Sequence, residues 1–72
     1  MKEIEKMFIP QLEAAPIEDF TEEELERVIK RIEHLEFTIK MADVLTGEDY
    51  KALDKLSYIK NRTRNLLGKE VK

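Results

Sequence analysis

Apolar and polar positions alternate with a helical period between residues 21 and 47. The apolar members recur at steps of three and four residues, which is the spacing of a stripe that packs along a second helix. They are Leu25, Val28, Ile32, Leu35, Ile39 and Ala42. Thr21, with Glu24 three residues later, forms a capping-box sequence, and Gly47 is a residue type that commonly ends a helix. The pattern therefore predicts a helix over about 22–46.

A second apolar stripe follows after a very short connection, with Thr46 as its candidate N-cap. It contains Ala52, Leu53, Leu56, Ile59, Thr63, Leu66 and Leu67, and Gly68 is its expected stop. A connection this short makes consecutive helices antiparallel neighbours. One register then aligns the two stripes and places Ala42 opposite Ala52 beside the turn. We predict an all-α protein organised as a long antiparallel helical hairpin, with its second helix over about 48–67.

Residues 1–20 form an arm that is rich in apolar side chains. Because proline disfavours helical geometry in the preceding residue, Pro10 and Pro16 limit this arm to one or two short helical turns, the first over about 2–8. The sizeable apolar residues are Ile4, Met7, Phe8, Ile9, Leu12 and Ile17. Such a load is heavy for a disordered tail, so we expect the arm to pack on another surface. The chain is interpreted as one domain, an arm followed by a hairpin over 21–72.

The first long helix carries a second apolar face, well away from the hairpin stripe. Projected at 100° per residue, this face contains Phe37, Met41, Val44 and Leu45, with His34 at its edge. A patch of this kind marks either a surface covered within the chain or an interface. The arm could cover it, two hairpins could bury it in a four-helix bundle, or it could await a target. Periodicity alone does not choose among these three arrangements.

Charge is high and unevenly distributed. Charged residues make up 40% of the chain, and the net charge is −3, which gives no general attraction to nucleic acid. Residues 1–47 hold six basic and twelve acidic side chains, whereas residues 48–72 hold seven basic and four acidic ones. Helix dipoles and pairing within the hairpin explain most of this asymmetry. The alternative is a nucleic-acid contact made by Lys51, Lys55, Arg62 and Lys69 beside Tyr58.

The residues that carry out catalysis or bind metals are sparse. The sequence contains no cysteine and a single histidine, His34, with no nucleophile placed beside it. The acidic residues Glu22, Glu23, Glu24 and Glu26 point in different directions around a helix, and no histidine stands at ligand spacing from them. Two glycines cannot build a phosphate-binding loop. We therefore predict no catalytic, cofactor-binding or metal site, and a protein that is not an enzyme.

The expected function is binding to another protein, as a small adaptor, regulator or inhibitor that also forms a homodimer. The predicted interface consists of Met7, Phe8, Ile9, Phe37, Met41, Val44, Leu45 and Tyr58. No apolar run is long enough to span a bilayer, so we expect no membrane association and a cytoplasmic location. In composition the chain resembles small accessory proteins of phages and mobile elements. A nucleic-acid-binding hairpin dimer is the alternative function.

Overall fold

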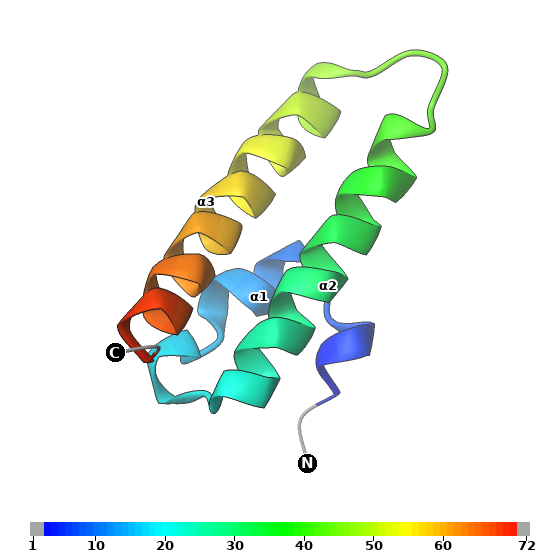
Figure 1. Ribbon diagram of the computed structural model, residues 1–72. Helices are drawn as coiled ribbons and strands as arrows, with labels where there is room; N and C mark the ends of the chain where they lie inside the picture. The colour runs from blue at the N-terminus through cyan, green and yellow to red at the C-terminus, as the bar shows by residue number, and fades with distance from the viewer. Residues whose placement is uncertain (1–2, 71–72) are drawn as a thin grey trace.

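The computed structural model describes residues 3–70, with side chains for residues 3–68. Two long helices, α2 (Glu22–Lys40) and α3 (Gly47–Glu70), run antiparallel and are joined by a turn (Figure 1). This arrangement confirms the all-α helical hairpin. The arm contains the 3-10 helix η1 (Ile4–Lys6), the short helix α1 (Ile9–Ala14) and the 3-10 helix η2 (Ile17–Asp19). The turn predicted over 2–8 is shorter than expected, and its first residue lies outside the described residues.

Both long helices begin at capping boxes. The Glu24 amide donates to Thr21 Oγ1 at 3.2 Å, and the Thr21 amide donates back to Glu24 Oε1 at 2.9 Å. The Asp49 amide likewise donates to Thr46 Oγ1 at 3.2 Å, and the Thr46 amide donates to Asp49 Oδ2 at 2.9 Å. The two caps predicted from the sequence are therefore confirmed, and each supplies partners for amides that a helix start leaves unpaired.

The predicted helix ends were wrong. α2 ends at Lys40 rather than near 46, and residues 41–46 form the turn. Thr46 is the non-helical N-cap of α3, so α2 could not have continued to this residue. Gly47 consequently opens α3 instead of closing α2, and no described glycine has a positive φ. α3 also continues through Gly68, where helical packing outweighs a propensity cost of about 1 kcal/mol. Ala42 lies exposed in the turn, so the Ala42–Ala52 layer does not form.

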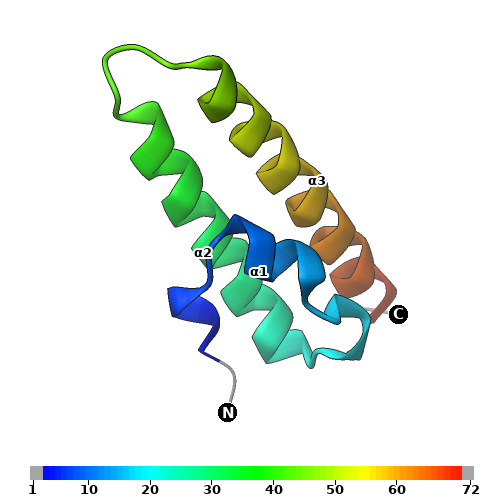
Figure 2. The ribbon, with the colours of Figure 1, turned by 180° about the vertical axis from the view of Figure 1, so that it is seen from behind.

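The core is built from three layers, because the arm packs across the hairpin of its own chain (Figure 2). Ile4, Leu12, Ala15, Ile17 and Phe20 are the arm residues buried in it. The hairpin contributes Leu25, Val28 and Ile32 from α2 with Leu56 and Ile59 from α3. Thr63 is buried beside them and donates its hydroxyl to the Ile59 carbonyl at 2.7 Å. The arm thus supplies the extra buried surface that two helices of this size need.

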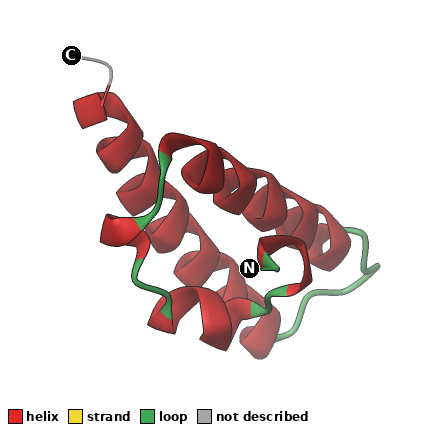
Figure 3. Ribbon diagram, turned by 90° about the horizontal axis from the view of Figure 1, so that it is seen from below, coloured by secondary structure: helices red, strands yellow, loops and turns green. Residues whose placement is uncertain are grey.

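The arm covers only one part of the hairpin. Seen from below, it lies along one side of the two long helices (Figure 3). The turn end of the hairpin extends beyond it, as Figures 1 and 2 show. The residues predicted to form a second apolar face lie at this turn end. Because α2 ends at Lys40, only Phe37 lies on the helix itself, and Met41, Val44 and Leu45 follow it in the turn. Phe37, Met41 and Val44 are exposed, so the arm does not cover them.

Candidate protein-interaction surface

Polar contacts fix the first part of the arm to α2. Arg27 donates from Nε to Glu5 Oε2 at 2.5 Å and from Nη2 to Glu5 Oε1 at 2.6 Å. These hydrogen bonds lower the pKa of Glu5 from 4.5 to about 2, and the same contact raises the pKa of Arg27. Arg31 donates from Nε to the Met7 carbonyl at 2.7 Å, and its guanidinium carbon lies 5.6 Å from the centre of the Phe8 ring. Arg27 and Arg31 therefore fix the first part of the arm to two successive turns of α2.

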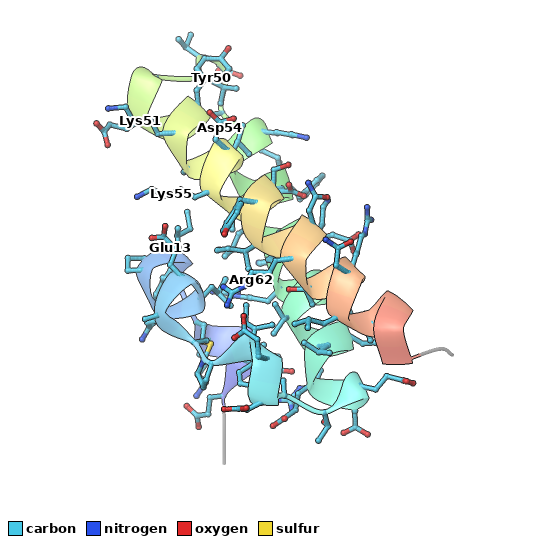
Figure 4. The ribbon with its side chains drawn as sticks, turned by 90° about the vertical axis from the view of Figure 1, so that its left-hand side faces the viewer. Glu13, Tyr50, Lys51, Asp54, Lys55 and Arg62 are labelled. Atoms are coloured by element: carbon cyan, nitrogen blue, oxygen red, sulfur yellow. The ribbon has the colours of Figure 1, made fainter. Side chains whose placement is uncertain are left out.

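Further ion pairs connect the arm to α3. Arg62 donates to Glu18, and this hydrogen bond lowers the pKa of Glu18. Lys55 Nζ lies 3.8 Å from Glu13 Oε1, and both side chains are partly exposed. Figure 4 shows Lys55 above Glu13 and Arg62 among the arm elements. The basic flank of α3 thus faces acidic residues of the arm in the same chain.

These contacts bear on the residues considered for nucleic-acid binding. Lys55 and Arg62 each have an acidic partner in the arm. Lys51 is exposed and lines a hollow of about 210 Å³ with Pro10 and Lys55. Lys69 falls where side chains lie outside the described residues. The predicted basic stripe is therefore partly neutralised where the arm packs against it.

An apolar surface remains in solvent at the turn end of the hairpin, and we call Phe37, Met41 and Val44 the turn patch. These residues are 63%, 66% and 79% exposed, respectively. The Met41 amide donates to the Phe37 carbonyl at 3.1 Å, so Met41 keeps its helical position one turn beyond Phe37. Tyr50, at the start of α3, is 58% exposed near the same end (Figure 4).

The remaining predicted interface residues are not gathered there. Met7 and Ile9 are half-buried against the core, and Phe8 is exposed beside Arg31. Leu45 is half-buried within the turn. Tyr58 is 67% exposed but lies two helical turns beyond Tyr50 along α3. The prediction did not include Tyr50 among the interface residues, although its position four residues after the Thr46 cap places it beside the turn.

A second feature arises only because the arm is docked. η1 and the outer face of α2 enclose a hollow of about 330 Å³, which we call the basic depression. It is lined by Glu5, Arg27, Lys30, Arg31 and His34. This feature could not be predicted from helical periodicity, because one of its walls comes from the arm, some twenty residues earlier in the chain. Its basic residues all lie on α2, on the same helix as Phe37.

The residues that the structure describes contain no group of three or more His, Cys, Asp or Glu side chains that could hold a metal ion. None of the helices that the structure describes combines the length and the apolar character needed to cross a membrane.

Comparison with known proteins gave no relative. No protein-family model, no curated protein and no solved structure matches this chain.

Proposed function

We propose that this chain is a non-enzymatic protein-interaction module that binds a partner through the turn patch. The observation that supports the proposal is the exposure of Phe37, Met41 and Val44. The arm does not cover them, because its apolar side chains are buried in the core. Apolar side chains that gather in solvent on a small protein are typical of binding surfaces. Phe37 lies on α2 and Met41 caps its end, whereas Val44 lies in the turn that joins α2 to α3. Holding anchor residues in place on a folded helix lowers the conformational cost of binding.

The size of the patch favours a compact contact. Stable protein–protein interfaces use roughly 20–30 residues on each side. The turn patch with Tyr50 offers only a few large apolar side chains. Such a surface suits the anchoring of a short partner segment, because a few well-placed apolar residues carry most of the energy in such contacts. Self-association through the same patch is the competing use of this surface. Nucleic-acid binding has less support because Lys55 and Arg62 are paired with the arm.

The proposal is tested by comparing variants of the full chain as bait in a lysate of the cells from which it originates. Phe37→Asp and Met41→Asp place a charge in the turn patch, and Tyr58→Asp is the matched control at an exposed aromatic residue elsewhere. We expect wild type and Tyr58→Asp to retain a common set of proteins that both patch variants lose. All three variants should keep their helical content, and their free energies of unfolding should change by less than about 0.5 kcal/mol.

Two results would contradict the proposal. If both patch variants retained the same proteins as wild type, the turn patch would not be the binding surface. If both variants lost the fold itself, Phe37 and Met41 would be structural residues that the molecule needs in its core. Circular dichroism with denaturant titration separates these outcomes from a specific loss of binding.

A further inference from the structure

The outer face of α2 carries a second stripe with the spacing of a helix–helix contact. It contains Arg27, Lys30, His34, Phe37 and Met41, which follow one another at steps of three, four, three and four residues. Steps of this kind keep side chains on one side of a helix that lies along another helix. The opposite, buried stripe already packs against α3 and the arm. The outer stripe is in contact with solvent, because four of its members are exposed and the Arg27 side chain is 32% exposed.

The chemistry of this stripe changes along the helix. Its first half lines the basic depression and its second half belongs to the turn patch. Lys30 and His34 have no side-chain hydrogen bond or ion pair among the described residues. The Glu5 carboxylate, the acidic group lining the depression, is bound by Arg27. Glu26 and Glu33 lie about one turn from Lys30 on the same helix, and neither forms an ion pair with it among the described residues. The Lys30 ammonium and the His34 imidazole are therefore available in the depression to an incoming acidic side chain.

Resting on the proposed function, we infer that the partner segment is an acidic amphipathic helix that lies along the outer stripe of α2. Its apolar residues contact Phe37 and Met41, and its carboxylates reach Lys30 and His34. Lys30 and Phe37 are seven residues apart, or roughly 10 Å along the helix axis. The acidic and apolar contact residues of the partner are then also about seven positions apart. Charge complementarity at this end fixes the direction in which the partner helix lies.

A second copy of the chain fits this stripe less well. The acidic first turn of α2, Glu22–Glu24, lies at the far end of the helix from the turn patch. An antiparallel pairing that brings it against Lys30 and His34 moves the two turn patches away from each other and leaves both uncovered. A parallel pairing places Lys30 against Lys30, which is repulsive. Neither arrangement satisfies the basic and the apolar halves of the stripe together.

The experiment is a selection from a phage-displayed library of helical peptides with randomised surface positions, using the full chain as bait. We expect the enriched peptides to share an apolar pair three or four positions apart and Asp or Glu about seven positions from it. One enriched peptide is then synthesised, and its affinity is measured against wild type, Phe37→Asp, the double variant Lys30→Glu with His34→Glu, and the control Tyr58→Asp.

Binding should be unchanged in the control, abolished in Phe37→Asp and weakened roughly tenfold or more in the double variant, with a further loss as salt is raised. Enriched peptides without acidic residues, or equal affinity for the double variant, would overturn the acidic-helix inference and leave the proposed function standing. An affinity that Phe37→Asp does not change would contradict both the acidic-helix inference and the proposed function. An empty selection would overturn the inference alone, as would a wild-type dimer in sedimentation equilibrium that Phe37→Asp converts to a monomer.

Discussion

Arg27 donates two hydrogen bonds, of 2.5 and 2.6 Å, to the Glu5 carboxylate. The two residues are 22 positions apart in sequence, so this contact joins α2 to the arm. Two parallel hydrogen bonds between a guanidinium and a carboxylate fix both distance and orientation. This contact places η1 beside the first half of α2 and shapes one wall of the basic depression. The position of the arm, and with it the exposure of the turn patch, depends on contacts of this kind.

Replacement of Glu5 by Gln should weaken arm docking in a pH-dependent way. The pKa of Glu5 is about 2 in the folded chain and 4.5 without its partner, so the ionised carboxylate stabilises the folded state fully above about pH 4.5. That contribution is lost as the pH falls from 4.5 toward 2. We expect the denaturation midpoint of wild type to fall more steeply over this window than that of Glu5→Gln, when both are followed by circular dichroism.

Glu3→Gln is the control for this experiment. The Glu3 carboxylate lies 3.9 Å from Lys6 within the same short turn, so it does not connect the arm to α2. Its pH profile should follow that of wild type. Identical profiles for wild type and Glu5→Gln would show that the Arg27 contact does not hold the arm in solution.

Replacement of Gly68 by Ala should stabilise the protein. Gly68 lies within α3 and has no positive φ, and apart from its own turn of helix no atom lies within 4 Å of the position that a Cβ would occupy. Alanine then fits without strain and favours the helix by up to about 1 kcal/mol. Gly47→Ala should act in the same direction, because its surroundings are equally open. Destabilisation of Gly68→Ala in urea titration would instead indicate a left-handed helix end at this residue.

Substitutions at Ile32 test how much buried apolar volume the small core can lose before the protein unfolds. Ile32 lies on α2 and is fully buried in the core that the arm and the hairpin share. Ile32→Val should lower the free energy of unfolding by about 0.5–1.5 kcal/mol, and Ile32→Ala by about 2–5 kcal/mol. A domain of this size holds only about 3–5 kcal/mol in total, so the alanine variant should be largely unfolded at 25 °C. A cooperative, wild-type-like transition in Ile32→Ala would contradict the assignment of Ile32 to the core.

The hairpin could be predicted because its signals are local. The caps at Thr21 and Thr46 depend on residues three positions away, and the buried stripes depend on a period of 3.6 residues. The helix ends were harder to predict because two local signals competed there. Gly47 favoured a stop, whereas the Thr46–Asp49 capping box favoured a start, and the capping box prevailed.

The place where the arm docks could not be predicted, because it depends on contacts between residues far apart in sequence. Ile4 and Leu12 are buried in the core. Their apolar character predicts that they are buried somewhere, but it does not indicate which half of the hairpin they pack against. The pairing of Arg27 with Glu5 competes with local helical pairs that the sequence offers equally well, such as Glu23 with Arg27. The basic depression follows from that docking and was therefore also missed.

The measurement that tests the account most directly compares Met7 with Met41 in one sample. Methionine methyl groups are labelled with ¹³C, assigned with Met7→Leu and Met41→Leu, and observed by NMR while a neutral paramagnetic cosolute is added over a range of protein concentrations. Met7 belongs to the docked arm and is half-buried against the core, whereas Met41 is 66% exposed. We predict that the Met41 signal broadens at cosolute concentrations that leave the Met7 signal sharp, at every protein concentration. Equal broadening of both signals would show that the arm is not docked, and a protected Met41 would show that the turn patch is covered.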